Sequence, residues 1–215
     1  MKTKICLLFV MILVAVSCAK NDGLADGKAI VAWGDSLTFG VKGGESYPKE
    51  LQRLTGIRVI NKGVSGAKSN TIAAEMVKRS DLYQYPIIIW VGRNNFRDPE
   101  QVKADIALMI SKLKHQHYLV LSILNKNTPD ELKGGKSYAI LAGLNNYLEE
   151  TYGNHFIDVR SYLIGSYNTG SSSDLMSYDA DVAPASLRID DLHLNAKGYD
   201  LVAQKVYEKF DILTK

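Results

Sequence analysis

Trp33-Gly34-Asp35-Ser36-Leu37-Thr38-Phe39-Gly40 is the stretch that decides the fold. It includes the end of a short apolar run, Ala29-Ile30-Val31-Ala32-Trp33, which is typical of a buried strand. A strand that ends in Gly-Asp-Ser leads into a loop, and in open α/β folds ligands bind at the carboxyl ends of the strands. Taken alone, the stretch is equally consistent with a plain turn, because Gly, Asp and Ser are common turn residues. Ser36 becomes a candidate nucleophile only if the rest of the chain supplies a base and hydrogen-bond donors.

Four further apolar runs predict strands, and the segments between them predict helices. The run at residues 86–91 has no polar alternation, which is typical of a central strand covered on both faces. Strands that alternate with helices predict parallel strands joined by right-handed crossovers. The sequence therefore predicts an α/β fold, a three-layer α/β/α sandwich with a five-stranded parallel sheet. The predicted strands are residues 28–33, 57–61, 86–91, 118–124 and 155–159, and the predicted helices are residues 47–54, 69–79, 98–114, 138–152 and 196–210.

The amino-terminal segment, residues 1–17, predicts a bacterial secretory signal peptide. Its start is basic, and residues 5–16 form an apolar run that is too short for a comfortable transmembrane helix. Ala15-Val16-Ser17-Cys18 resembles the lipobox of bacterial lipoproteins, in which Cys18 becomes the lipidated first residue; an ordinary cleaved signal peptide is the alternative. Residues 18–27 then predict a flexible tether and residues 28–215 the folded domain. We therefore expect an exported protein of the bacterial cell envelope, held at the membrane by a lipid on Cys18.

Composition narrows the chemistry of the folded domain. Both cysteines, Cys6 and Cys18, fall in or directly after the signal, so the domain has no thiol for a disulfide, a metal site or a nucleophile. Beyond residue 17 there are 24 basic and 23 acidic residues, a balance that predicts no strong attraction to nucleic acid. His115 and His117 form a His-x-His pair, but their position at the end of a predicted helix favours histidines stabilised by the helix dipole. We expect no metal and no cofactor.

Four short blocks, in order along the chain, resemble those of the SGNH hydrolase superfamily, also called GDSL esterases and lipases. The blocks are Gly34-Asp35-Ser36-Leu37, Asn61-Lys62-Gly63-Val64-Ser65-Gly66, Gly92-Arg93-Asn94-Asn95 and Asp190-Asp191-Leu192-His193. One block could arise by chance, but four in order, each at a strand end or before the last helix, form a specific match. The resemblance covers essentially the whole domain and implies the flavodoxin-like fold of that superfamily.

The resemblance also implies a serine esterase. Ser36 would be the nucleophile, His193 would take its proton and later protonate the leaving alcohol, and Asp190 would orient the imidazole. The tetrahedral intermediate would receive hydrogen bonds from the backbone N–H groups of Ser36 and Gly63 and from the side-chain amide of Asn94. Together these groups would form the triad and the oxyanion hole.

Three neighbouring residues leave alternatives open. Asp191 is another possible partner for the imidazole, although an offset of two residues is less favourable than the three that separate Asp190 from His193. Asn95 stands where the superfamily usually has Asp, a position that supports loop geometry. Arg93 either contacts a carboxylate or another polar substituent of the substrate or forms a salt bridge with a nearby loop.

The predicted function is that of an exported serine esterase that forms an acyl-enzyme. Acetylated carbohydrate is the first candidate substrate, because residues 160–188 are predicted as a long, irregular, polar loop that contains tyrosines, and such loops are often functional. A lysophospholipase, a short-chain lipase or a thioesterase is the alternative, although no extended apolar lid is present in the sequence. A catalytically inactive surface binding lipoprotein is the alternative of another class, and the complete set of site residues argues against it.

Overall fold

The computed structural model describes residues 29–40 and 45–214. The predicted signal peptide, the lipidation site Cys18 and the predicted tether lie outside the described residues, as do the first and last residues of the predicted domain. Among the helices that the structure describes, none combines the length and the apolar character needed to cross a membrane.

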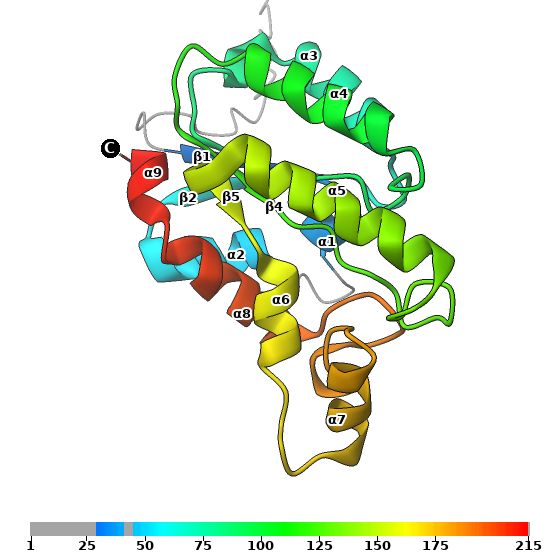
Figure 1. The fold of residues 1–215 in the computed structure, drawn as a ribbon. Helices are drawn as coiled ribbons and strands as arrows, with labels where there is room; N and C mark the ends of the chain where they lie inside the picture. Colours follow the sequence, from blue (N-terminus) through cyan, green and yellow to red (C-terminus); the bar gives the residue numbers. More distant parts are fainter. Residues whose placement is uncertain (1–28, 41–44, 215) are drawn as a thin grey trace, which may run out of the picture.

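Five parallel strands form one sheet with helices on both sides, which confirms the predicted α/β sandwich (Figure 1). The strand order is β2-β1-β3-β4-β5. β1 pairs with β2 from Ala29 opposite Arg58 to Gly34 opposite Gly63, and it pairs with β3 on its other side. The loops that follow these three strands therefore leave the same edge of the sheet. The strands are β1 (Ala29–Gly34), β2 (Arg58–Gly63), β3 (Ile87–Trp90), β4 (Tyr118–Leu121) and β5 (Phe156–Ile157).

Helices cover both faces of this sheet. One face carries α3 (Ser69–Val77), α4 (Pro99–Ser111) and α5 (Lys136–Tyr152). The other face carries α2 (Tyr47–Thr55), α6 (Val159–Gly165), α8 (Ala196–Tyr207) and α9 (Phe210–Thr214). The short helix α1 (Ser36–Phe39) follows β1 directly, and the 3-10 helices are η1 (Ser80–Leu82), η2 (Gly153–His155) and η3 (Ala185–Leu187).

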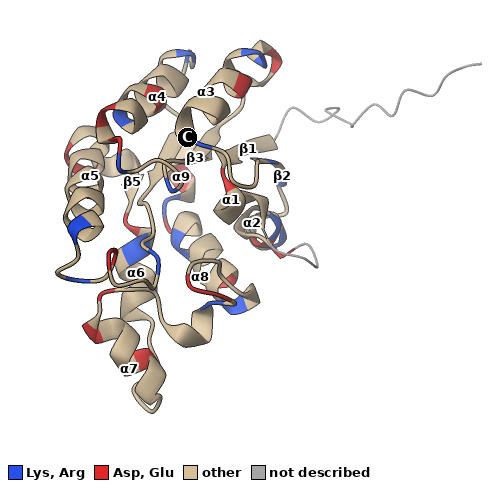
Figure 2. Ribbon diagram, turned by 90° about the vertical axis from the view of Figure 1, so that its right-hand side faces the viewer, with Lys and Arg blue, Asp and Glu red and all other residues tan. Residues whose placement is uncertain are grey.

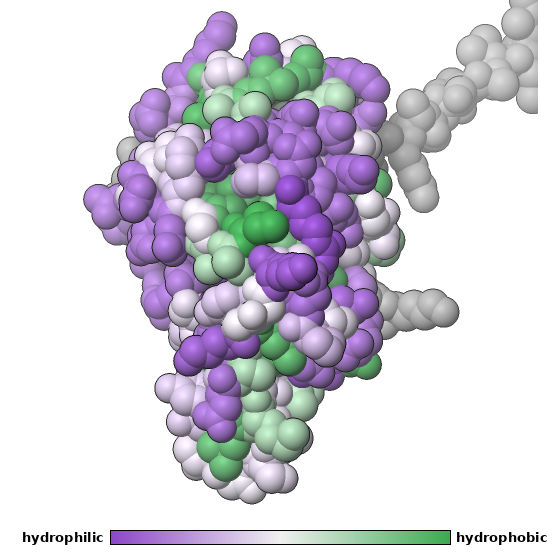
Figure 3. Space-filling model, turned by 45° about the vertical axis from the view of Figure 1, so that its right-hand side comes forward, coloured by the Kyte–Doolittle hydropathy of each residue, from purple (hydrophilic) through white to green (hydrophobic). Residues whose placement is uncertain are grey.

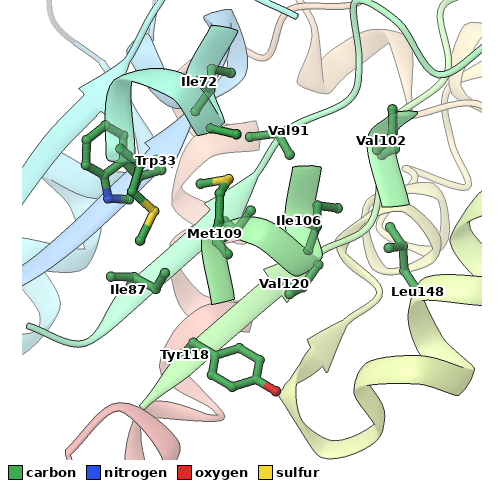
Figure 4. Close-up of a cluster of buried hydrophobic side chains, with 14 of the residues drawn as sticks. Trp33, Ile72, Ile87, Val91, Val102, Ile106, Met109, Tyr118, Val120 and Leu148 are labelled. Atoms are coloured by element: carbon green, nitrogen blue, oxygen red, sulfur yellow. The ribbon is translucent and has the colours of Figure 1, made fainter. Parts of the chain in front are cut away.

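Two hydrophobic cores lie on the two faces of the sheet, because successive strand residues point to opposite sides. On β1, Val31 and Trp33 face α3, α4 and α5, whereas Ile30 and Ala32 face α2 and α8. Both faces are buried, and this is why the central strands are apolar at every position. Figure 4 shows the first core, where sheet residues meet helix residues that include Ile72, Met109 and Leu148.

The segment 160–188 is not the irregular loop that the sequence predicts. It contains most of α6, the whole of α7 (Ser172–Asp179), which projects below the sandwich in Figure 1, and η3. The hydroxyl of Ser171 accepts the N–H of Asp174 and caps α7, since serine is favoured at helix caps as well as in loops. The buried carboxylate of Asp174 in turn accepts the N–H and the hydroxyl of Ser186, which ties α7 to η3.

The predicted last helix, residues 196–210, is divided into α8 and α9. The short α9 returns the chain to the start of β1 (Figure 1). Ala29, Phe210 and Leu213 line one apolar pocket of about 410 Å³ together with residues at the starts of β2 and β3. Both ends of the described chain therefore lie at the amino edge of the sheet, opposite the loops that carry the four blocks.

Candidate active site

Ser36 is the first residue of α1, directly after β1 and its one-residue connection, Asp35. The buried carboxylate of Asp35 accepts the N–H of Leu37 at 3.0 Å and so caps α1. Burial raises the pKa of Asp35 to about 6, although the Leu37 N–H and the nearby Arg93 lower it. Asp35 thus organises the loop that carries Ser36.

The structure brings Ser36, His193 and Asp190 together from opposite ends of the chain. Ser36 Oγ lies 3.0 Å from His193 Nε2. On the other side of the ring, His193 Nδ1 lies 2.7 Å from Asp190 Oδ2. A serine hydroxyl, an imidazole and a carboxylate in this order can pass a proton from the hydroxyl to the ring while the carboxylate stabilises the imidazolium.

The carboxylate of Asp190 also closes the turn on which it lies. Its Oδ1 accepts the N–H groups of Leu192 and His193, each at 2.7 Å. Partial burial raises the pKa of Asp190, but these N–H groups and the imidazole outweigh burial and bring the pKa down to about 2. Arg188 also stabilises this turn, because its guanidinium donates hydrogen bonds to the carbonyl groups of Ala183 and Asp190. Asp190 therefore stays ionised throughout the neutral range.

Asp191, the alternative partner for the imidazole, contacts a different loop. Its carbonyl oxygen accepts the Asn127 N–H at 2.8 Å, and its Oδ1 lies 3.5 Å from the Asn127 amide nitrogen. These contacts join the loop that carries Asp190 and His193 to the segment that follows β4.

The Gly63 N–H, which the resemblance assigns to the oxyanion hole, already has an acceptor within the protein. It donates to Oδ1 of Asn61, two residues earlier, at 2.8 Å. Gly63 also packs so closely on α1 that a Cβ at this position would lie 2.1 Å from the Phe39 nitrogen. Gly63 therefore serves the close approach of β2 to α1, and the structure corrects its expected role as a donor.

Gly66, the second glycine of the same block, has a backbone N–H that is free to donate to an oxyanion, whereas the N–H of Gly63 is already used. Its φ of +74° lies in the left-handed region that glycine adopts without strain, and its N–H has no acceptor among the described residues. The next residue, Ala67, accepts a hydrogen bond from Asn94 Nδ2 at 2.9 Å, which places Asn94 beside it. Asn94 keeps a second amide hydrogen, and the Ser36 N–H likewise has no acceptor in the described part of the chain. Reasoning from sequence missed Gly66, although a second glycine in the block was visible.

Arg93 forms a buried ion pair with Glu131. Its Nη2 lies 2.8 Å from Glu131 Oε1, and both side chains are less than 10% exposed. Glu131 Oε2 also accepts the Lys126 N–H at 2.8 Å. Of the two predicted alternatives for Arg93, the salt bridge to a nearby loop is the one that the structure contains. The sequence offered no sign of this partner, which lies 38 residues away.

His115 and His117 lie before β4, at the edge of the sheet opposite Ser36. His115 Nδ1 accepts the His117 N–H at 3.1 Å, and His117 Nδ1 lies 3.2 Å from the Ile212 carbonyl oxygen. Within residues 29–40 and 45–214, no group of three or more His, Cys, Asp or Glu side chains is arranged to hold a metal ion. Acidic and basic residues are interspersed over the fold (Figure 2).

A polar cavity of about 450 Å³ opens beside Asn94. Its lining residues are Lys68, Arg93, Asn94, Asn95, Phe96, Arg97 and Asp98. Exposed hydrophobic side chains lie in or near the blocks as well, namely Phe39, Val64 and Ile189. Others lie on α7, and Figure 3 shows hydrophobic residues at the lower end of the molecule, which α7 forms.

Solved structures with this fold include several hydrolases. A putative lipolytic protein of the G-D-S-L family from Desulfitobacterium hafniense DCB-2 is 19% identical, with a TM-score of 0.64 over 85% of this chain and 99% of that chain. The acetyl xylan esterase AlAXEase is 19% identical, with a TM-score of 0.62 over 84% and 98% of the two chains. Axe2, an acetylxylan esterase from Geobacillus stearothermophilus, is 16% identical, with a TM-score of 0.57 over 85% and 94%. At these identities the likeness establishes a shared fold.

Sequence comparison identifies the family. A tail spike protein of Salmonella phage epsilon15 is 26% identical over 133 residues, which are 58% of this chain and only 12% of that protein's length. The profile of the GDSL-like Lipase/Acylhydrolase family matches residues 32–201, a span that includes every block of the site. The chain belongs to the GDSL-like lipase/acylhydrolase family.

Proposed function

We propose that this enzyme hydrolyses carboxylic esters through an acyl-enzyme on Ser36. The observation that carries the proposal is the continuous contact from Ser36 Oγ to His193 Nε2 at 3.0 Å and from His193 Nδ1 to Asp190 Oδ2 at 2.7 Å. The imidazole takes the hydroxyl proton as Ser36 Oγ bonds to the ester carbonyl carbon. It then gives that proton to the departing alcohol. A water molecule attacks the acyl-enzyme in the same way, which releases the acid and restores Ser36.

The developing oxyanion would be held by the backbone N–H groups of Ser36 and Gly66 and by the Asn94 amide. The absence of acceptors for the two N–H groups among the described residues supports this set, as does the hydrogen bond of Asn94 to Ala67, the neighbour of Gly66. Such donors contribute most when they are already in place before the reaction, and loss of one typically lowers the rate ~100- to 1,000-fold.

A short acyl group on a carbohydrate is the substrate that the site fits best. The apolar pocket of about 410 Å³ lies at the amino edge of the sheet, beyond the reach of an acyl chain bonded to Ser36. The cavity beside Asn94 is lined mainly by charged and amide side chains. Two structural neighbours are acetyl xylan esterases, which supports an acetylated sugar.

A lipid ester is the second candidate, because the exposed side chains of Phe39, Val64 and Ile189 lie in or near the blocks of the site. The two candidates are separated by hydrolysis rates for three kinds of ester: acetylated xylo-oligosaccharide, lysophosphatidylcholine, and p-nitrophenyl esters with acyl chains of two to twelve carbons. We expect acetyl esters to give the highest kcat/KM. A preference for the lysophospholipid or for acyl chains of eight or more carbons would contradict the carbohydrate assignment.

The acyl-enzyme itself is tested with a fluorophosphonate probe, which forms a covalent adduct with activated serines. We expect labelling of the wild type and none of Ser36→Ala, with the melting temperature of both proteins measured to show that the variant is folded. A wild type that is not labelled would refute the esterase mechanism and favour a binding lipoprotein instead.

We also infer that the chain is exported and lipid-anchored through Cys18. Support comes from the sequence alone, in the apolar run of residues 5–16 and the small residues that precede Cys18. Incorporation of radiolabelled palmitate into the wild type, and its loss in Cys18→Ser, is the expected result. Equal incorporation into both proteins, or into neither, would contradict the anchor.

A further inference from the structure

A polar relay, buried at Ser69 and Asp105, connects the loop after β2 to the loop after β3. The N–H of Ser69 donates to Asn95 Oδ1 at 3.0 Å, and Asn95 Nδ2 donates to Ser69 Oγ at 2.9 Å. The Ser69 hydroxyl then gives its own hydrogen to Asp105 Oδ2 at 2.6 Å. Gln101 Nε2 completes the relay by donating to Asp105 Oδ1 at 2.8 Å. Both oxygens of the Asp105 carboxylate therefore have a donor.

This relay lies directly behind the proposed oxyanion donors. Asn94 precedes Asn95 and bonds to the Ala67 carbonyl, while Asn95 bonds to Ser69 two residues further on. The two loops are thus joined by two successive contacts, and Gly66 directly precedes Ala67, the acceptor in the first of them. Movement of Asn95 relative to Ser69 would change the separation between the Asn94 amide and the Gly66 N–H.

Only one of the two side chains that contact the Ser69 hydroxyl, those at positions 95 and 105, can be a carboxylate. Ser69 is fully buried and Asp105 is 5% exposed, so a partner lost from either group leaves a buried polar atom without a hydrogen bond, which is costly. The hydroxyl of Ser69 carries a single hydrogen, which Asp105 receives. Asn95 fits because its Nδ2 supplies a hydrogen to Ser69 Oγ, while its Oδ1 accepts the backbone N–H of Ser69 and leaves the hydroxyl hydrogen to Asp105. A carboxylate at position 95 would compete with Asp105 for that hydrogen, with two negative charges facing one buried hydroxyl.

We propose that Asn95, Ser69 and Asp105 are positioning residues, which hold the Asn94 amide and the Gly66 N–H at the separation that the oxyanion requires. The inference rests on the proposed esterase function and adds to it the support that fixes the donor pair. The direction of these hydrogen bonds can be reversed. With Asp at position 95 and Asn at position 105, the Ser69 hydroxyl would donate to the carboxylate at position 95 and would accept a hydrogen from the amide at position 105.

The test compares Asn95→Asp, Asp105→Asn and the double variant with the wild type. Asn95→Asp should lower kcat for a p-nitrophenyl acetate substrate by up to ~100-fold, the loss that a displacement of about 1 Å can cause, with KM changed by less than about 3-fold. Asp105→Asn should lower kcat by only about 10-fold, because its amide oxygen still accepts the Ser69 hydrogen while its amide nitrogen faces the Gln101 amide nitrogen. The double variant should recover to the level of Asp105→Asn. Fluorophosphonate labelling rates should follow the same order, since the adduct also places an oxygen in the donor site.

Two further variants make the test specific. Ser69→Ala removes the hydroxyl that connects positions 95 and 105. In that background, addition of Asp105→Asn to Asn95→Asp should no longer restore activity. Asp158→Asn is the matched control, an Asp-to-Asn change at the cap of α6, and it should leave kcat unchanged. Melting temperatures are measured for all variants, and kinetics are measured well below the lowest of them.

The outcomes separate the inference from the function beneath it. If Asn95→Asp lowers the melting temperature but leaves kcat and the labelling rate at wild-type values, the relay is purely structural and the inference is overturned. Failure of the double variant to recover would likewise overturn it. A wild type that neither hydrolyses esters nor reacts with the probe would refute the esterase function, and the inference would fall with it.

Discussion

Replacement of the buried Asp35 by Asn should make the protein more stable at neutral pH, by an amount that disappears as the pH falls to 4. Asp35 is 1% exposed, and among the described residues its Oδ2 has no hydrogen-bond partner. Burial raises its pKa from 3.8 to about 6. Between these two pH values the folded protein keeps a proton that the unfolded chain has lost. The stability that the protonated group contributes is therefore fully present below pH 4 and is lost as the pH rises through 6.

The size of the effect follows from the pKa. Each pKa unit corresponds to 1.36 kcal/mol, so a rise of about 2 corresponds to ~3 kcal/mol of unfolding free energy, without reduction by solvent because the carboxyl group is buried. In Asp35→Asn the side chain would be uncharged at every pH and would keep the oxygen that accepts the Leu37 N–H. The free energy of unfolding of Asp35→Asn, minus that of the wild type, should therefore increase by ~3 kcal/mol between pH 4 and pH 8.

Urea denaturation of both proteins at five pH values across this range measures the difference, in which the titrations of all shared groups cancel. Asp35→Ala is the control: it loses the cap of α1, which costs about 1 kcal/mol, yet its difference from the wild type should have the same pH dependence. A difference that stays constant from pH 4 to pH 8 would refute the reasoning.

Three further outcomes test other parts of the site. Asn94→Ala should lower kcat ~100- to 1,000-fold with little change in KM, measured by ester hydrolysis, and an unchanged kcat would remove Asn94 from the oxyanion hole. Glu131→Ala should lower the unfolding free energy by about 3–5 kcal/mol, because it leaves the Arg93 charge buried without its partner; a loss below about 1 kcal/mol in urea would show that Arg93 finds water. Gly63→Ala should displace α1 and abolish activity, since the new Cβ would lie 2.1 Å from the Phe39 nitrogen, and a crystal structure with α1 in place would contradict this.

Local pattern was sufficient to predict the architecture. The apolar runs that predict strands are apolar because both faces of the sheet are covered, so the pattern reports burial directly. The segment 160–188 was misjudged because serine, glycine and aspartate are as frequent at helix caps as in loops, and the helix they cap, α7, has a weakly amphipathic sequence. Its anchor, the buried Asp174, depends on Ser186 twelve residues away, which no local pattern reveals.

In the site as well, contacts between residues close in sequence could be predicted, whereas contacts between distant residues could not. Asp190 and His193 are three residues apart, so their contact is a property of one turn and could be predicted from spacing. The sequence assigned the oxyanion N–H to Gly63 and missed Gly66, because only the coordinates show that the Asn61 side chain already accepts the Gly63 N–H. The ion pair of Arg93 with Glu131 is also non-local, because it spans the connection from β3 through β4.

The described chain starts and ends at the amino edge of the sheet, and Ser36 lies at the opposite edge. Attachments to the chain ends are therefore separated from the active site by the sheet. Ala29 and Leu213 line the same pocket, so a short peptide could join the two ends and new ends could be opened elsewhere. A support, a fluorescent domain or a carbohydrate-binding module fused at either end would stand behind the sheet and leave the approach to Ser36 open. The enzyme is therefore suited to display on a bead or in an array without re-engineering of its catalytic face.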